Sequence, residues 1–451
     1  MFKWILCGAL ACQIPAPICA SDHQQGGDPF ALYRAENFSG AIEAAEARLA
    51  SDLENPVWWA LLGEAHARLG ETAEAAEAFG RAAQFETDAA GRSYFLRAQA
   101  LQLVYADRRE EARDIVRAAM NDSSLETRNS LDWAMVAISA RDDRSAQEIL
   151  DNEALYGEFT RQTALDAGYS AKRRGMDERA VDFFRRGLAR DVREAVPLET
   201  VQREAIRREN RELTRDWSLA SQSSFSSAGE PIGLVNTPLP NEDAVQFGAE
   251  VSRRIGGWRN GRPISLFARV FHSEFLSRDT MTGNATQGWL GVRYKPLSQL
   301  NFNLEASRLI ALDDEGIDDW SLRAAISGGR GVEPEVGQKS WAYVHYYGDG
   351  SHLVDTDVTL GLAEGRAGYS FLLDESATVL TPYAVARLGI DTGRADQEAF
   401  GAGLGISLRH WFDETETIAY RSFVDFDVQA RQRIAGDRRA SGVLATLSFG
   451  R

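Results

Sequence analysis

The residues that could carry out catalytic or metal chemistry are few and lie far apart along this sequence. The histidines are His23, His66, His272, His345, His352 and His410. No two of them have the spacing that places two ligands on one helix face, so we expect no metal site and no cofactor. The pair Ser351-His352 is the nearest approach to the nucleophile and base of a hydrolase, but no third group accompanies it. We therefore expect that the protein is not an enzyme.

A glycine-rich stretch near the end of the chain offers another candidate chemistry, the binding of phosphate. It reads FGAGLGISLRHWF, and its glycines are Gly401, Gly403 and Gly405. A dinucleotide-binding loop follows a buried strand and opens a helix. Here a polar segment precedes the glycines, and apolar residues continue to alternate as far as Phe412 without a helical period. The pattern therefore favours a β-strand whose glycines thin its inner face or allow it to curve.

The composition restricts the compartment and the partners. The chain has 451 residues and a net charge of −16, which disfavours nucleic acid as a partner. Its start, MFKWILCGALACQIPAPICA, has a basic residue, a short apolar run and a final small residue, which is typical of a signal peptide over residues 1–20. A lipoprotein leader processed at Cys12 is the alternative. Cys7, Cys12 and Cys19 all lie in this leader, so we expect a mature chain without disulfides.

Residues 28–215 have the composition and the spacing of α-helices. From Pro56 to Ala89 the packing positions of a tetratricopeptide repeat carry the residue types that the repeat requires. These positions are Trp59, Leu62, Gly63, Gly70, Ala75, Phe79 and Ala82. A second unit with the same spacing has Gly175, Ala180, Phe184 and Gly187. We expect either a concave surface that binds partner proteins or a plain spacer of stacked helices.

Residues 216–451 change to a period of two and are rich in Gly, Ser, Thr and aromatic residues. About twelve runs of alternating apolar and polar residues are separated by polar segments, as in an outer-membrane β-barrel. A soluble β-sandwich also alternates, but the leader, the length of the runs and the charges on one face favour the barrel. The candidates for its aromatic girdles are Trp258, Trp289, Trp320, Trp341, Tyr346, Tyr347 and Trp411. The expected fold is an N-terminal α-solenoid followed by an antiparallel transmembrane β-barrel.

Charged residues occupy the polar face of these runs and should point into the lumen of the barrel. The lumen-facing candidates are Glu250, Arg269, Arg293, Glu305, Arg323, Arg409, Arg421, Asp425 and Asp427. They could line a polar path for a sugar chain, or they could form a salt-bridged wall that fills the interior. The acidic segments LDDEGIDD and YGDGSHLVDTD could bind cations, or they could be ordinary solvated loops.

Several segments of the second half resemble a known family. In chain order they are GWLGVRYKPLSQLNFNLEASRLIAL, DDWSLRAAIS, AGYSFLL, TPYAVARLGID, FGAGLGISLRHWF and RSFVDFDVQARQR. Together they resemble the C-terminal domain of bacteriophage adsorption protein A from roughly Ala244 to Phe449, and helical repeats ahead of that domain also fit the family. The resemblance implies an outer-membrane protein that is linked to the secretion of a surface glycan and used by a phage as a receptor. It supplies no catalytic residues to carry over.

The sequence therefore predicts an outer-membrane protein whose N-terminal domain lies in the periplasm. The first hypothesis is export or surface presentation of an exopolysaccharide, with the repeat domain recruiting periplasmic proteins. The second is a phage receptor or a structural protein with a plugged barrel, and the third is a membrane hydrolase. The expected partners are outer-membrane lipid and periplasmic proteins, together with polysaccharide or phage according to the hypothesis, and no nucleic acid.

Overall fold

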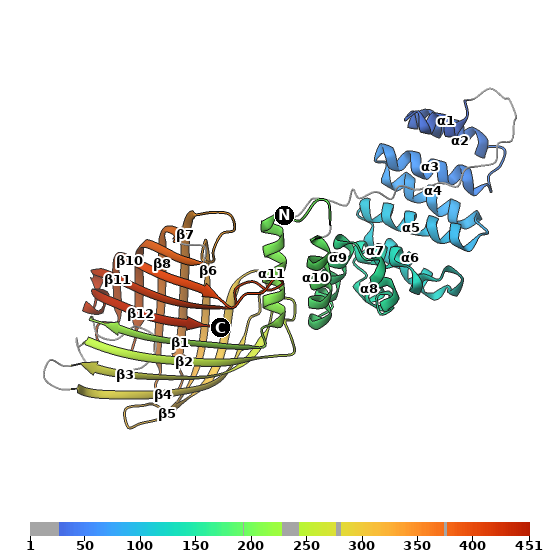
Figure 1. The fold of residues 1–451 in the computed structure, drawn as a ribbon. Coiled ribbons are helices and arrows are strands. Elements are labelled where there is room, and N and C mark those ends of the chain that lie inside the picture. The colour runs from blue at the N-terminus through green and yellow to red at the C-terminus, as the bar shows by residue number, and fades with distance from the viewer. Residues whose placement is uncertain (1–26, 193, 228–242, 277–280, 374–376) are drawn as a thin grey trace. The chain divides into compact units, whose positions relative to one another are not determined.

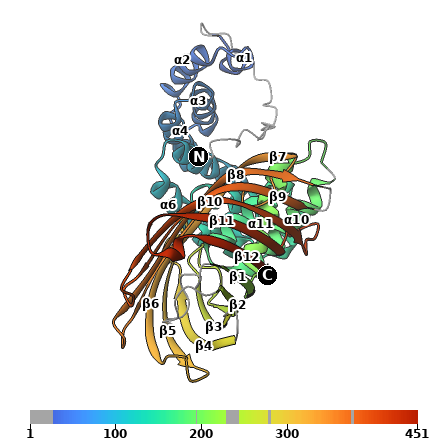
Figure 2. The same cartoon turned by 90° about the vertical axis from the view of Figure 1, so that its left-hand side faces the viewer.

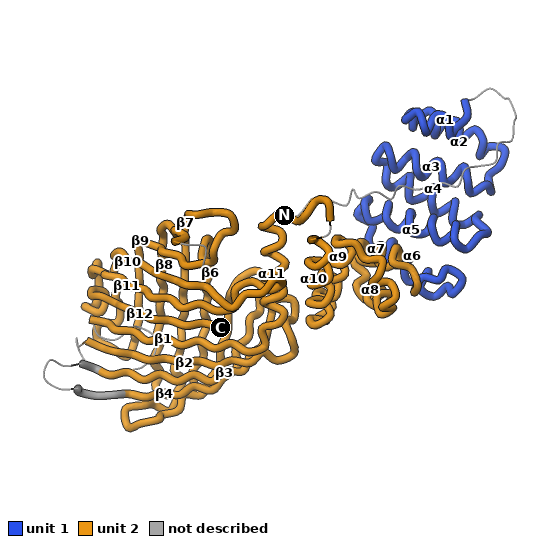
Figure 3. Tube along the Cα trace, in the orientation of Figure 1, with its two compact units in different colours: residues 1–127 blue, residues 128–451 orange. Residues whose placement is uncertain are grey.

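The computed structural model describes residues 27–451 except 193, 228–242, 277–280 and 374–376. The expected leader over residues 1–20 lies outside the described residues. Helices form the first part of the described chain and strands the second, and the change falls between Thr214 and Trp217 (Figure 1). The chain divides into two compact units, residues 1–127 and residues 128–451 (Figure 3).

The first unit is a stack of paired helices. Its helices are α1 (Pro29–Arg34), α2 (Phe38–Leu49), α3 (Pro56–Leu69), α4 (Thr72–Phe85), α5 (Ala89–Tyr105), α6 (Arg109–Asn121) and the 3-10 turn η1 (Ser123–Leu125). The predicted repeat unit is confirmed as α3 and α4. Gly70 ends α3 in the left-handed conformation, with φ of 80°, which a residue without Cβ adopts freely. A Cβ on Gly63 would lie 2.9 Å from the ring of Phe79, so the two helices require a small residue there.

The second unit begins with helices that repeat this packing. They are α7 (Leu131–Ser139), α8 (Asp143–Ile149), α9 (Arg161–Arg173), α10 (Asp177–Asp191) and α11 (Thr200–Thr214), with 3-10 turns η2 (Thr127–Asn129) and η3 (Glu153–Glu158). The predicted second repeat unit is α9 and α10, and Gly175 between them has φ of 73°. Trp133, Phe183 and Phe184 are fully buried in this part of the unit. None of the described helices is long and apolar enough to cross a membrane.

Twelve strands follow and close into one barrel (Figure 2). They are β1 (Trp217–Ser226), β2 (Asp243–Ile255), β3 (Ile264–Leu276), β4 (Met281–Tyr294), β5 (Asn301–Ala311), β6 (Asp319–Arg330), β7 (Ser340–Leu353), β8 (Val358–Leu372), β9 (Thr378–Asp391), β10 (Glu398–Phe412), β11 (Ser422–Gly436) and β12 (Gly442–Gly450), with the 3-10 turn η4 (Arg438–Ala440) before β12. Neighbouring strands are antiparallel, and β1 pairs with both β2 and β12. Because every strand has two partners, the barrel has no free edge.

The antiparallel barrel that the sequence predicts is therefore confirmed. We call the end at which β1 begins and β12 ends the proximal end, and the opposite end the distal end. The outer face is apolar, and the side chains of Leu290, Leu404 and Phe426 are 55, 71 and 50 % exposed. The glycine-rich stretch is strand β10, as expected, and not a phosphate-binding loop.

The prediction that the aromatic candidates form outer girdles is wrong for several of them. Trp320 and Tyr346 do point outward, but the inward-facing candidates are Trp289, Trp341, Tyr347 and Trp411. Trp289 packs with Phe267 and Leu309 inside the barrel. Aromatic rings occupy these places because the interior of a narrow barrel must be filled by side chains.

Candidate functional site

The inner wall formed by β2 to β6 carries a network of paired charges. Glu250 on β2 binds Arg269 on β3 at 2.5 Å and Arg293 on β4 at 2.9 Å. Arg293 also binds Glu305 on β5 at 2.6 Å, and Arg323 on β6 binds the same carboxylate at 3.1 Å. The ion pairs join strands that are neighbours or next neighbours, so they run along the wall of the barrel.

A second network lies on the inner wall formed by β8 to β11. Arg366 on β8 binds Asp427 on β11 at 3.0 Å. Tyr383 on β9 donates a hydrogen bond to the same carboxylate, with Oη 2.7 Å from Oδ2. Arg409 on β10 binds Asp425 on β11 at 3.1 Å. These contacts bridge strands one to three apart in the chain and consolidate the wall.

The structure thus brings the candidate lumen charges together in two groups and places one of them elsewhere. Arg421 precedes β11 and lies in the turn 413–421, at the proximal mouth of the barrel. Sequence reasoning missed further charges of the two networks, namely Asp349, Glu364, Arg366 and Arg387. They obey the same alternation. For Glu364 and Arg366, glycines and alanines on the outer face of β8 weaken the apolar signal that would have revealed them.

Helix α11 lies at the proximal mouth and is bound to two turns of the barrel. The guanidinium of Arg211 binds Glu333 in the β6–β7 turn at 2.9 Å and donates to the carbonyl of Tyr420 in the β10–β11 turn at 3.1 Å. Asn210 is fully buried, and its Nδ2 donates to the carbonyl of Thr417 at 2.8 Å. Burial lowers the pKa of Arg211, but the neighbouring carboxylates, Glu333 first, outweigh it and raise that pKa above its usual value. Arg211 is therefore a permanent positive charge at the mouth.

The end of α10 holds α11 in place through a buried carboxylate. Asp191 is fully buried, and it binds Arg161 at the start of α9 at 2.9 Å and Arg203 on α11 at 2.5 Å. The backbone N–H of Leu198, just before α11, donates to the same carboxylate at 2.7 Å. Burial alone would raise the pKa of Asp191, but these donors outweigh it and lower the pKa. Contacts with α9 and α10 therefore hold α11 in position, in addition to its contacts with the barrel.

Two further contacts attach the helices of this unit to the β2–β3 turn. The carboxylate of Asp177 at the start of α10 accepts a hydrogen bond from the backbone N–H of Trp258 at 2.5 Å. The side chain of Asn260 donates to the carbonyl of Arg173 on α9 at 3.0 Å. Helices α9 to α11 are consequently in direct contact with the proximal turns of the barrel.

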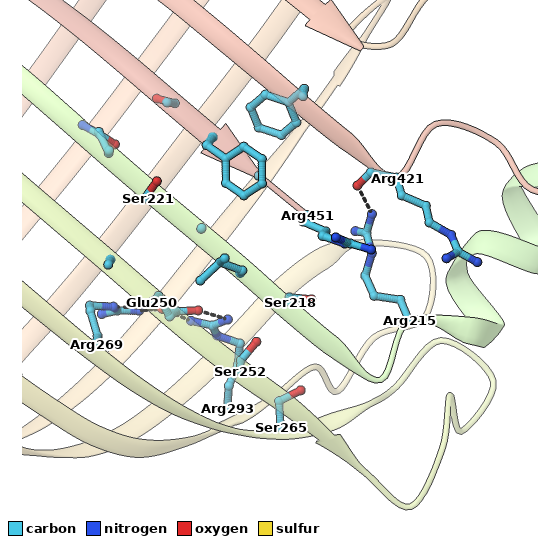
Figure 4. Close-up of a pocket in the computed structure, with 18 of the residues that line it drawn as sticks. Arg215, Ser218, Ser221, Glu250, Ser252, Ser265, Arg269, Arg293, Arg421 and Arg451 are labelled. Carbon is cyan, nitrogen blue, oxygen red and sulfur yellow. Dashed lines mark hydrogen bonds and ion pairs between the residues drawn. The ribbon is translucent and has the colours of Figure 1, made fainter. Parts of the chain in front are cut away.

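A cavity of about 810 Å³ lies between α11 and the inner wall at the proximal end (Figure 4). Arg211 and Arg215 line it from the helical side, and Glu250, Arg269 and Arg293 line it from the wall. The serine residues that line it are Ser218, Ser221, Ser252, Ser265 and Ser448. Guanidinium and hydroxyl groups of this kind bind polar solutes by hydrogen bonds and by charge.

At the distal end, loops are bound to residues of the barrel itself. Gln287 on β4 is almost fully buried, and it exchanges two hydrogen bonds with the backbone of Ile317 in the β5–β6 loop, at 2.8 and 2.9 Å. Asp319 accepts hydrogen bonds from the backbone N–H groups of Asp355 at 2.7 Å and Thr356 at 3.1 Å. The last carboxylate of the segment LDDEGIDD therefore holds the neighbouring loop.

The groups that could perform covalent chemistry do not come together in this arrangement. Ser351 and His352 are adjacent in β7, so their side chains lie on opposite faces of the strand and cannot act as nucleophile and base. His352 Nδ1 instead lies 3.1 Å from Oγ1 of Thr359. Within the ranges that the structure describes, no cluster of His, Cys, Asp and Glu side chains could hold a metal ion.

Comparison with solved structures finds partial matches to both parts of the chain. MamA is 17 % identical, with a TM-score of 0.30 over 37 % of this chain and 96 % of MamA. The β domain of the Bordetella autotransporter BrkA is 13 % identical, with a TM-score of 0.31 over 52 % of this chain and 98 % of that domain. An outer membrane channel from Pseudomonas putida F1 is 9 % identical, with a TM-score of 0.30 over 52 % of this chain and 95 % of the channel. No curated protein matches the sequence.

Comparison with protein families finds a match, and it lies within the barrel. Residues 278–447 match the family described as bacteriophage N adsorption protein A, C-terminal domain, which confirms the resemblance predicted from the sequence. The apolar outer face, the closed barrel and the preceding tetratricopeptide-like helices agree with that match. The chain is an outer-membrane β-barrel protein, and residues 278–447 of its barrel are similar to the C-terminal domain of bacteriophage N adsorption protein A.

Proposed function

We propose that this protein exports an exopolysaccharide or presents it at the cell surface. The barrel domain, residues 216–451, would supply the passage, and the helical domain, residues 28–215, would recruit periplasmic partners. The observation that carries the proposal is the polar cavity of about 810 Å³ at the proximal mouth. This mouth would face the periplasm, where the helical domain is expected to lie.

The chemistry of this cavity supports a sugar chain as the ligand. A polysaccharide that leaves water must replace the hydrogen bonds of its hydroxyl groups with bonds to the protein. The serine hydroxyls and guanidinium groups around the cavity offer such bonds. Polar groups continue from the cavity along the inner wall, where Glu250 and Arg269 lie. The family resemblance, which links its members to the secretion of a surface glycan, supports the same ligand class.

The proposal is tested by removing the barrel in the native host and measuring the polysaccharide outside the cell. Deletion of residues 216–451 should reduce the extracellular polysaccharide and leave material in the periplasm. Re-expression of the full chain from a plasmid should restore secretion, which controls for effects of the deletion on other genes. An unchanged extracellular yield in the deletion strain would overturn the proposal.

A second candidate function is a phage receptor or structural protein with a plugged barrel. It is favoured by the binding of α11 across the proximal mouth through Asn210 and Arg211, and by the distal loop that Gln287 holds. The purified full chain should then show no conductance in a planar lipid bilayer. Phage adsorption should be compared between cells with and without the barrel. Loss of adsorption in cells that lack the barrel would identify the receptor role, because a phage requires its receptor even when secretion of the glycan continues.

A further inference from the structure

The charges around the proximal cavity are not balanced. Eight arginines but four acidic residues line it, although the whole chain has a net charge of −16. The arginines deeper in the barrel are neutralised, since Arg269 and Arg293 both bind Glu250 and Glu305. The excess positive charge therefore lies at the rim of the cavity, next to α11.

Arg211, Arg323 and Arg451 are also paired with carboxylates. The arginines that remain are Arg215, Arg254 and Arg421. Within the described part of the chain, no carboxylate lies at ion-pair distance from any of the three guanidinium groups. Arg215 donates to the carbonyl of Arg421 at 3.1 Å, and Arg254 donates to the carbonyl of Glu212 at 2.8 Å. Figure 4 shows Arg215 and Arg421 close together beside α11, apart from the Glu250 network. Neutral backbone oxygens thus satisfy some of their donors, and the nearest carboxylates, such as Glu212, act on Arg215 and Arg254 only from beyond ion-pair distance.

One of these donors has no acceptor among the described residues. Arg254 Nη1 is buried, and no described group accepts a hydrogen bond from it. The rest of this guanidinium is held in place, because Nη2 donates to Glu212 and the group lies 4.9 Å from the centre of the Trp258 ring. A buried donor without a partner is rare in folded proteins and calls for an acceptor at that position. Burial also lowers the pKa of Arg215, and the cations Arg211 and Arg421 lower it as well, while Glu212 and Glu333 act in the opposite direction without restoring the usual value.

We propose that Arg215, Arg254 and Arg421 form a binding site for the acidic groups of an anionic polysaccharide at the periplasmic mouth of the barrel. The site deepens the proposed function and rests on it, because it assigns the charge class of the glycan. A guanidinium presents its N–H groups in a planar fork that matches the oxygens of a carboxylate or a phosphate. An acidic sugar residue would accept from Arg254 Nη1 and also balance the rim charge. A neutral sugar could accept the same hydrogen bond through a hydroxyl oxygen but would leave the charge unbalanced, so the site discriminates by charge.

Binding to the purified full chain in detergent tests this site without requiring transport. Hexagalacturonate supplies carboxylates, and maltohexaose is a neutral chain of the same length. We expect hexagalacturonate to bind, with an affinity that falls as salt is added, and maltohexaose to bind far more weakly. The triple variant R215Q/R254Q/R421Q should lose at least about tenfold in affinity for hexagalacturonate, as expected when charge-assisted hydrogen bonds are removed.

Arg253→Gln is the matched control. Arg253 immediately precedes Arg254 on β2, but its guanidinium lies over the ring of Trp217 on the outer face, 5.2 Å from the ring centre. Loss of this guanidinium should therefore leave binding of hexagalacturonate unchanged. The variant R215K/R254K/R421K keeps the charge but loses the forks, and it should bind between the parent and the triple Gln variant. Heat-dependent electrophoretic mobility verifies that each barrel is folded.

Three results would overturn the site. They are equal binding of the acidic and neutral hexamers, parent-like binding by the folded triple Gln variant, and binding of inorganic phosphate or hexaglutamate as tight as that of hexagalacturonate. Failure of the site is distinguishable from failure of the proposed function. If the barrel deletion stops secretion while the hexamers bind equally, the function stands and the site is refuted. If the purified chain selects hexagalacturonate while the deletion leaves secretion unchanged, the site stands and the export role is refuted.

Discussion

At the residue scale, Gly405 in β10 is required by its neighbour on the adjacent strand. A Cβ at this position would lie 2.4 Å from the ring of Tyr383, whose hydroxyl donates to Asp427. We expect Gly405→Ala to displace Tyr383 and to cost about 1–3 kcal/mol of barrel stability, as overpacking does. The urea midpoint for loss of the folded, heat-modifiable band measures this cost.

The control for this substitution is Gly365→Ala in β8, where a Cβ would meet nothing within 4 Å. Its urea midpoint should match that of the parent chain. If Gly405→Ala and Gly365→Ala gave the same midpoint, the tight contact between Gly405 and Tyr383 would have no energetic weight.

A second residue-scale prediction concerns the buried carboxylate of Asp191 and the pH. Its pKa is lowered in the folded state, so its contribution is present above the unfolded pKa of about 4 and is lost as the pH falls through the folded value. Asp191→Asn leaves Arg161 and Arg203 without their carboxylate and should cost about 3–5 kcal/mol at neutral pH. The difference between variant and parent should shrink as the pH falls below about 4.

Urea unfolding of the helices, followed by far-UV circular dichroism at several pH values, tests the role of Asp191. Asp182→Asn is the matched control, because Asp182 lies on the same helix, is half exposed and pairs with Arg186 at the surface. That variant should change stability by well under about 1 kcal/mol. A loss at Asp191 that is independent of pH would mean that packing, and not the carboxylate charge, explains the effect.

At the element scale, α11 is predicted to obstruct the proximal mouth until its contacts with the turns are broken. Glu333 in the β6–β7 turn binds Arg208 at 3.1 Å and Arg211 at 2.9 Å. Glu333→Gln should weaken the docking of α11 by about 1–3 kcal/mol, because both charged partners are lost at once. We expect the purified variant to conduct more often in planar bilayers than the parent.

Glu335→Gln in the same turn is the control, since it also removes one negative charge but leaves the ion pairs of Glu333 with Arg208 and Arg211 intact. It should conduct like the parent. Equal conductance of the Glu333 and Glu335 variants would show that α11 is not the barrier to ions at this mouth.

At the scale of the whole molecule, the two compact units should unfold separately. Each helix pair of residues 28–127 packs against its neighbours along the stack, so its stability is local. The barrel is closed by pairing of β1 with β12, which ties its strands into one cooperative ladder. Hydrogen exchange in detergent with increasing urea should therefore expose peptides of α2 to α5 before those of β2 to β11. Coincident exposure of both sets would contradict this division.

Much of this architecture follows from local patterns. The repeat unit at α3 and α4 is predictable because Gly63, Gly70 and Phe79 occupy positions that only their own helix pair constrains. The faces of the strands are predictable because a lipid-facing side must be apolar at every second residue. Arg293 and Glu305 could be assigned to one face for that reason, but which charges pair depends on strand register.

The sequence by itself determined the two periodicities, the order of helices and barrel, and the polar face of most strands, because each of these depends on residues close together in the chain. Only the tertiary structure decided that Trp289 and Trp411 point inward and that α11 binds the turns at the proximal mouth. It also decided that Arg215 meets Arg421, which lies 206 residues away in the sequence. Barrel closure brings such distant turns together, and no local period records which of them will meet.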